Sequence, residues 1–255
     1  MCNTLTEELR AHGFQTKIYI VENYDKKADY PNVSLGDDLE SGEINGLAMV
    51  STGRLSKFCD ELIRRKTPFI DFGGNTHVKE HCYQDHLNFL TSSINYFKKK
   101  GMKNIAVMSL GDEDANFQKL KNEELGFDKT YSVTSPIVNQ VSQNTDMVNI
   151  EEIGFICMNK IIKGKTHPGA LVITDDVLAK GATQSLYGAK KNTGPKFPVL
   201  TLANSKVKLF YPTKIIKYEY DTDQFIKLAV GQLMKQIDGK EITSLKPFKG
   251  GIIKS

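Results

Sequence analysis

The stretch PGALVITDDVLAKGA, residues 168–182, decides the fold class of this chain. Residues 170–174 (ALVIT) are short, apolar and rich in β-branched side chains, which is typical of a strand buried on both faces. An amphipathic helix follows directly, with its apolar residues on one face: Leu178, Ala182 and Leu186. A buried strand that turns at once into a helix is the repeating unit of a parallel α/β sheet.

The same alternation of short apolar strands and amphipathic helices runs along the rest of the chain. Expected strands are residues 17–21, 46–50, 68–72, 105–108 and 198–202. Expected helices carry apolar stripes within residues 4–12, 55–63, 87–97, 117–125, 148–162 and 225–237. The first of these helices opens on a capping box at Thr4 and Glu7, and a polar loop containing Asp37 and Asp38 separates the first two strands. A break between residues 73 and 85 divides the run in two, which predicts two doubly wound, Rossmann-like lobes with parallel sheets.

Length and composition are those of a globular protein and exclude several functional classes. The 255 residues are 40% apolar and 25% charged, and the net charge of +4 comes from interspersed signs rather than from a basic, nucleic-acid-binding patch. The densest basic run, residues 98–100, precedes Gly101 and fits the last turn of a helix. No apolar window reaches the length of a membrane span, and the first residues carry no secretory signal. The four cysteines form no CxxC pair, which favours a reduced, cytoplasmic protein.

No catalytic, cofactor or metal motif is matched. The tripeptide GKT at residues 164–166 looks like the end of a phosphate-binding loop, but Asn159 stands where that loop needs glycine. A second group contains residue types that bind metals: His77, His81, Cys82, Asp85 and His86. Its glycine and β-branched neighbours favour an irregular connection in which Asp85 caps the following helix. The sequence therefore predicts no metal, no cofactor and no enzyme activity.

Acidic side chains stand where two of the expected strands end, and ligands of doubly wound sheets bind at that edge. Asp71 ends an otherwise apolar strand, and Asp175 and Asp176 follow residues 170–174. One of the pair is expected to cap the next helix, which leaves the other for a ligand. Carboxylates accept paired hydrogen bonds from vicinal hydroxyls, so a sugar-like polyol fits better than Mg²⁺, for which no nucleotide site is found nearby. For Asp71, a solvated strand end or a cap is the structural alternative.

Several blocks, taken in order, resemble the effector-binding domain of the LacI/GalR family of bacterial transcriptional regulators. The block that carries most of the resemblance is residues 168–182. The others are LRAHGF (9–14), NGLAMV (45–50), PFIDFGG (68–74), the helix from Asp85 to KGMKNIAV (100–107), LGF (125–127) and VLTLAN (199–204). A carboxyl-terminal helix ends near residues 239–240. No single block is specific, whereas their order and spacing from residue 5 to about 247 are.

The resemblance implies a type I periplasmic-binding-protein fold with two lobes, a small-molecule effector in the cleft between them, and a homodimer. We expect one lobe at residues 1–84 plus about 219–243 and the other at 85–218 plus about 244–255. The family's helix-turn-helix and first strand have no counterpart here, so the first sheet is expected to have an exposed edge or to be completed by a partner. DNA would be bound only through a segment outside this sequence, and no membrane partner is expected.

The resemblance also assigns ligand contacts. Asp71 and Asp175 match positions that contact the sugar in the family. Glu123 stands where the family usually has a sugar-binding arginine, and Asn204 follows the place of a usual acidic residue. Thr52, after residues 46–50, completes the candidate set. Because Glu123 replaces a donor with an acceptor, a cationic, amino-bearing or purely hydroxylated ligand is favoured over an ordinary hexose.

The expected function is therefore the sensing of a sugar-like effector for a cytoplasmic regulator of LacI type. A solute-binding protein of a sugar transporter, built on the same fold, is the alternative. An enzyme on a flavodoxin-like lobe ranks third because no catalytic motif is found, and fold alone does not decide function.

Overall fold

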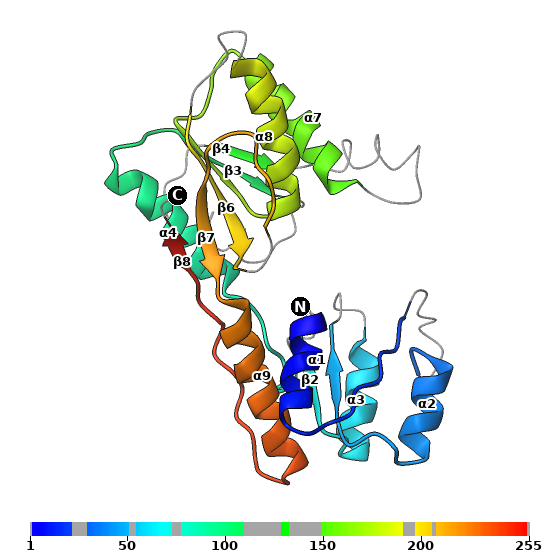
Figure 1. The fold of residues 1–255 in the computed structure, drawn as a ribbon. Coiled ribbons are helices and arrows are strands. Elements are labelled where there is room, and N and C mark those ends of the chain that lie inside the picture. The colour runs from blue at the N-terminus through cyan, green and yellow to red at the C-terminus, as the bar shows by residue number, and fades with distance from the viewer. Residues whose placement is uncertain are drawn as a thin grey trace. The chain divides into compact units, whose positions relative to one another are not determined.

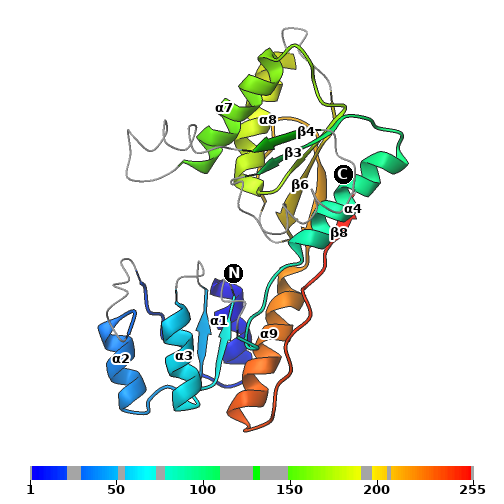
Figure 2. The same ribbon diagram turned by 180° about the vertical axis from the view of Figure 1, so that it is seen from behind.

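The computed structural model of the chain describes residues 2–21, 30–50, 55–72, 78–109, 129–132, 149–190, 197–205 and 208–253 (Figures 1 and 2). The chain divides into two compact units. Unit 1 comprises Met1–Gln84 and Asp221–Phe248, and unit 2 comprises Asp85–Tyr220 and Lys249–Ser255. Each unit has a sheet with helices packed against it, and the strands are parallel, as the sequence predicts, apart from one edge strand of unit 2. Across the described ranges, the helices are too short or too polar to span a bilayer.

Unit 1 is built on two parallel strands, β1 (Leu47–Met49) and β2 (Phe69–Asp71), in which Leu47 pairs with Phe69. Its helices are α1 (Cys2–Ala11), α2 (Val33–Glu40), α3 (Ser56–Arg65) and α9 (Thr222–Ile237). Figure 1 shows α1 and α3 on opposite sides of the strands.

Alternate side chains of the strands in unit 1 enter different hydrophobic clusters, because successive residues of a strand point to opposite faces. Ile70 joins a cluster with Leu5 of α1 and Phe225 of α9. Phe69 joins a second cluster with Leu35 of α2 and residues of α3 that include Phe58 and Leu62. Both faces of β2 are therefore covered, and its three residues are buried.

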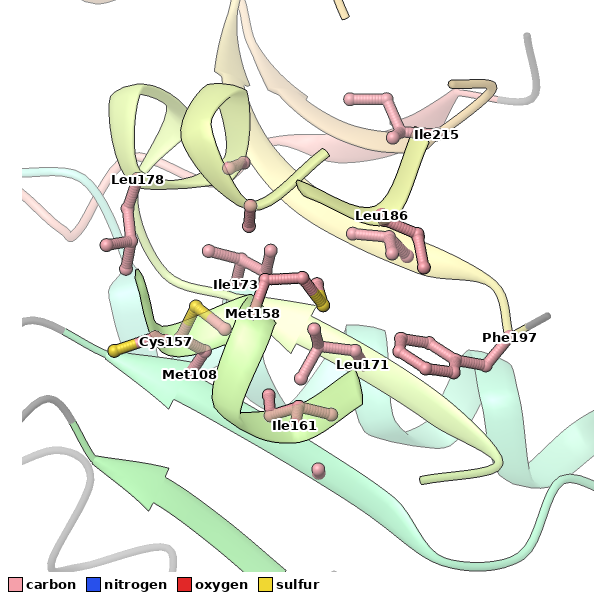
Figure 3. Close-up of a cluster of buried hydrophobic side chains, with 14 of the residues drawn as sticks. Met108, Cys157, Met158, Ile161, Leu171, Ile173, Leu178, Leu186, Phe197 and Ile215 are labelled. Carbon is pink, nitrogen blue, oxygen red and sulfur yellow. The ribbon is translucent and has the colours of Figure 1, made fainter. Parts of the chain in front are cut away.

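Unit 2 is a six-stranded sheet in the order β4-β3-β5-β6-β7-β8. Its strands are β3 (Ile105–Ser109), β4 (Lys129–Ser132), β5 (Ala170–Ile173), β6 (Val199–Asn204), β7 (Ile216–Tyr220) and β8 (Gly251–Ile253). All neighbours are parallel except β8, which is antiparallel to β7. The helices are α4 (His86–Lys99), α7 (Ile150–Lys163) and α8 (Asp176–Lys190). Side chains of α7 and α8 meet those of the central strands in the buried cluster of Figure 3, which includes Met158, Leu171 and Leu186.

Two glycines allow α7 and α8 to approach closely. A Cβ atom at Gly154 of α7 would lie 2.0 Å from the Leu178 carbonyl oxygen of α8. A Cβ atom at Gly181 of α8 would lie 1.7 Å from the Glu151 carbonyl oxygen of α7. The helix pair is held at its rim by an ion pair of 2.7 Å between Lys180 and Glu151.

Three local predictions are wrong. Residues 17–21 form no strand, because a strand exists only beside a hydrogen-bonded neighbour and the described residues supply none there. Asp37 and Asp38 belong to α2 rather than to a loop, since Asn32 caps that helix by accepting from the Leu35 N–H at 3.2 Å. The first helix begins at Cys2, which places Thr4 inside it and rules out the predicted capping box. Four elements were not predicted: α2, β4, β7 and β8. The expected helix within residues 117–125 lies outside the described residues.

Candidate functional site

Polar side chains gather at the carboxyl ends of β5 and β6, two neighbouring parallel strands of unit 2. Asp175 and Asp176 follow β5, and Asn204 is the last residue of β6. The buried Thr201 hydroxyl of β6 is within 3.1 Å of the Ile173 carbonyl oxygen and 3.3 Å of the Asp175 carbonyl oxygen. This hydroxyl fixes the turn after β5 to the neighbouring strand. The two sets of polar groups therefore share one edge of one sheet.

Asp175 is the residue of the acidic pair that caps α8. Its carboxylate accepts a hydrogen bond of 2.8 Å from the Leu178 N–H, and its carbonyl oxygen accepts one of 3.0 Å from the Ala179 N–H. The prediction that one aspartate of the pair caps the helix is confirmed. The capping bond occupies one carboxylate oxygen and holds the half-buried side chain at the amino end of the helix, where the helix dipole favours negative charge.

Asp176 is the other acidic group at this edge, and it is half-buried. Burial raises the pKa of Asp176, and the neighbouring charge of Asp175 raises it further. The Tyr211 hydroxyl lies 3.5 Å from the Asp176 carbonyl oxygen. Burial also raises the pKa of Tyr211, with the Asp176 charge as the next cause. Tyr211 was not among the sequence candidates, because nothing in its local sequence places it beside residues that lie thirty-five positions earlier.

In unit 1 the corresponding edge carries Asp71, the last residue of β2. Its side chain is wholly buried, with 0% exposure. Its backbone N–H donates to the Glu80 carbonyl oxygen at 3.1 Å, and its carbonyl oxygen accepts from the Cys82 N–H at 2.8 Å. The segment around His81 therefore runs along β2 and bridges to it. Asp71 is therefore not a solvated strand end.

The interior around Asp71 holds several ionisable groups. Burial raises the pKa of the Cys59 and Cys82 thiols to about 12, and the Asp71 carboxylate adds to both shifts. Glu80 is buried, and its Oε2 atom has no hydrogen-bond partner within the described residues. The His81 ring stacks on Tyr83 with ring centroids 4.6 Å apart. Glu80 was missed by sequence reasoning because its burial depends on the packing of its segment beside β2.

The group of metal-binding residue types between His77 and His86 forms no metal site within the described residues. Among the residues that the structure describes, no set of three or more His, Cys, Asp or Glu side chains is arranged to hold a metal ion. Asp85 caps α4 instead, with its carboxylate accepting from the Asn88 N–H at 2.8 Å, as predicted. His77 lies outside the described residues, and so do the candidates Thr52 and Glu123.

Comparison with known proteins identifies the fold. No family model and no curated protein matches the sequence. A LacI family transcriptional regulator from Bifidobacterium animalis subsp. lactis matches with a TM-score of 0.74 at 16% identity, covering 99% of this chain and 90% of that chain. The Lac repressor bound to ONPG in the repressed state matches with a TM-score of 0.72 at 11% identity, covering 99% and 75%. A dimeric Lac repressor with an 11-residue C-terminal deletion matches with a TM-score of 0.74 at 12% identity, covering 99% and 90%. The chain has the α/β fold with parallel sheets of these regulators, which confirms the predicted fold class.

Proposed function

We propose that this chain is the ligand-sensing part of a cytoplasmic bacterial regulator of LacI type and that its ligand is a small, sugar-like polyol. One observation carries the proposal: the fold agrees with that of LacI-family regulators over 99% of the chain. The regulators that match are binding proteins, and no catalytic constellation was found in the sequence, so the proposed role is binding without catalysis.

The chemistry of the sheet edges supports a hydroxylated ligand. Asp175 offers, at the end of β5, the carboxylate oxygen that does not cap α8, and Asn204 offers an amide at the end of the adjacent β6. Carboxylates accept hydrogen bonds from hydroxyl groups, and an amide both accepts and donates. An acidic lining also favours a ligand that carries an amino group. The proposed contacts are Asp71, Asp175, Glu123, Asn204 and Thr52.

The assembly and the partner are part of the same proposal. One of the matching structures is a dimeric Lac repressor, which supports a homodimer here. DNA contact is assigned to a segment outside this sequence, since the positive charges of the chain are interspersed with negative ones.

Thermal shift with a panel of sugars, polyols and amino sugars tests the ligand class. A ligand that binds only the folded chain raises the melting temperature by mass action. We expect at least one member of the panel to do so in a concentration-dependent way. If none does, the ligand class is wrong.

Asp175→Asn tests the site because asparagine keeps the helix cap and removes the charge. Asp221→Asn is the matched control: Asp221 caps α9 through the Asp223 and Gln224 N–H groups and is not a proposed contact. The ligand-induced shift should fall in Asp175→Asn and persist in Asp221→Asn. Equal responses would remove Asp175 from the site. Asp71 is a poorer choice for this test, since its buried side chain couples binding to stability.

A further inference from the structure

Unit 1 contains a cavity of ≈ 1110 Å³. Small-molecule sites usually measure about 300–1,000 Å³, so this space is large for such a ligand. It is bordered by β1, by α1 and α9, by Leu35 of α2, and by residues 14–21, which connect α1 to the segment before α2. Apolar side chains of both hydrophobic clusters, including Leu5 and Phe58, reach its surface.

One wall of the cavity is an edge of β1 that has no strand beside it within the described residues. The ladder to β2 uses alternate residues: the Leu47 N–H donates to the Pro68 carbonyl oxygen at 2.9 Å, and the Phe72 N–H donates to the Met49 carbonyl oxygen at 2.7 Å. In an extended chain, the residues that alternate with Leu47 and Met49 direct their N–H and C=O groups to the opposite side. Those residues are Ala48 and Val50, which line the cavity. In the described part of the chain neither N–H has a hydrogen-bond partner, and Val50 is 52% exposed.

Unit 2 shows what occupies the same position in a complete sheet. There the Leu171 N–H of β5 donates to the Pro198 carbonyl oxygen at 3.0 Å, just as Leu47 donates to Pro68. On its other edge β5 meets β3, and the Thr174 N–H donates to the Met108 carbonyl oxygen at 3.0 Å. Thr174 lies three residues after Leu171, and Val50 lies three residues after Leu47, so Thr174 and Val50 hold corresponding positions. All four residues of β5 are buried, whereas β1 is only partly buried. The cavity thus takes the place in unit 1 that β3 takes in unit 2.

Residues 14–21 also border the cavity and form neither a helix nor a strand. The Lys17 ammonium and the Tyr19 hydroxyl both donate to the Asp38 carboxylate, which fixes one side of the segment. Ile18 and Ile20, which alternate with Lys17 and Tyr19 along the chain, are 70% and 71% exposed and line the cavity. The order along the chain matches unit 2, where β4 comes before α7 and β5 and lies on the far side of β3. Residues 14–21, α2 and β1 follow one another in the same way.

We propose that this cavity accepts one extended peptide strand that runs parallel to β1 and bonds to the backbone of Ala48 and Val50. The side chains of such a strand would alternate between the α1–α9 cluster and the α2–α3 cluster, both of which are apolar. The occupant is therefore an uncharged segment with apolar residues at successive positions, the composition of β3 itself. Strand addition of this kind takes its affinity from main-chain bonds and its specificity from side-chain pockets.

A fluorescein-labelled, end-blocked peptide with the sequence of residues 104–109 (NIAVMS) is the probe. Fluorescence anisotropy should show saturable binding with one peptide per chain. Hydrogen exchange should slow at the Ala48 and Val50 amides. Absence of binding would overturn the proposal.

A second peptide distinguishes binding by strand pairing from binding by apolar contacts alone. In β3 the Met108 carbonyl oxygen points to β5, so the Met108 N–H points to the same side. The same peptide N-methylated at this methionine keeps its apolar side chains and loses one ladder bond. It should bind at least about tenfold more weakly, because an unmade hydrogen bond leaves a buried acceptor unpaired. Equal binding of the two peptides would show an unspecific apolar cavity and refute the strand.

Ala48→Pro tests the protein side of the same contact. It removes an N–H that takes no part in the β1–β2 ladder, at an edge position where proline is tolerated. Peptide affinity should fall while the melting temperature without peptide stays close to that of the parent chain. Sedimentation of the parent chain with and without peptide identifies a competing occupant. A self-associated form that the peptide does not dissociate would assign the cavity to a second copy of the chain and overturn the proposal.

Discussion

Replacing Gly181 of α8 with alanine has two opposing effects on the stability of the chain. In a helix interior alanine is favoured over glycine by about 1 kcal/mol, so helix propensity alone predicts stabilisation. The new Cβ atom, however, would lie 1.7 Å from the Glu151 carbonyl oxygen of α7. The obstacle is backbone, which cannot rotate away as a side chain would, so α7 and α8 must separate. Overpacking costs about 1–3 kcal/mol, and a contact this short puts the cost at the upper end.

The net expectation for Gly181→Ala is a loss of about 2 kcal/mol in the free energy of unfolding. Gly188→Ala is the matched control in the same helix, because a Cβ atom there meets nothing within 4 Å. That variant should gain about 0.5–1 kcal/mol. In urea unfolding followed by circular dichroism, with a slope of about 2 kcal/mol/M, the midpoint falls by about 1 M for Gly181→Ala and rises slightly for Gly188→Ala. A Gly181→Ala protein as stable as the parent chain would refute the close approach of the two helices.

Four further predictions concern individual side chains. Tyr220→Phe removes the hydroxyl that donates to the Asp85 carbonyl oxygen at 2.9 Å and should cost about 1–2 kcal/mol in urea unfolding; an unchanged midpoint would show that this bond is absent. Asp85→Ala should cost about 1 kcal/mol through loss of the α4 cap, whereas Asp85→Asn should cost far less, and equal losses would argue against capping. At pH 8 a thiol reagent should modify the exposed Cys2 rapidly but Cys59 and Cys82 only on unfolding, because burial raises the pKa of these two thiols to about 12. Because the folded chain keeps these two thiols protonated, they contribute to stability below pH 9.0, their ordinary pKa, and this contribution is lost as the pH rises toward 12. The melting temperature should therefore fall across that range.

Elements whose boundaries are set by local chemistry were predicted well. The start of α4 depends on the Asp85 cap, and its end is followed by Gly101, which has a φ of 72° that glycine adopts without strain. β5 and α8 follow from an apolar run and an apolar stripe. In each case the residues that specify the element lie within it or next to it. A single stretch of sequence is therefore enough to predict each of these elements.

Elements that depend on distant neighbours were missed. β7 carries Lys217 and Glu219 and is unevenly buried, and its place in the sheet depends on pairing with β6 on one side and β8 on the other. β8 is largely exposed and owes its strand geometry to pairing with β7. At the candidate site, Tyr211 and Glu80 reach their positions through tertiary packing. Asp175 was predictable because a helix cap has a local signal.

The incorrect strand at residues 17–21 and the partial burial of β1 have one physical cause. Residues 46–50 and 170–174 have the same apolar pattern, and Leu47 and Leu171 make the same bond to a proline carbonyl. Within the described residues, β5 also has a strand on its other edge and β1 does not, and only β5 is fully buried. A sequence window specifies which residues are able to form a strand, whereas the strand itself requires a partner with its own N–H and C=O groups. A peptide strand in the cavity has two edges, so its binding should bring residues 17–21 into the ladder together with β1. Slowed amide exchange at Ile18 or Ile20 as well as at Ala48 would demonstrate this. Slowed exchange in β1 alone would show that the bound peptide pairs with β1 but not with residues 17–21.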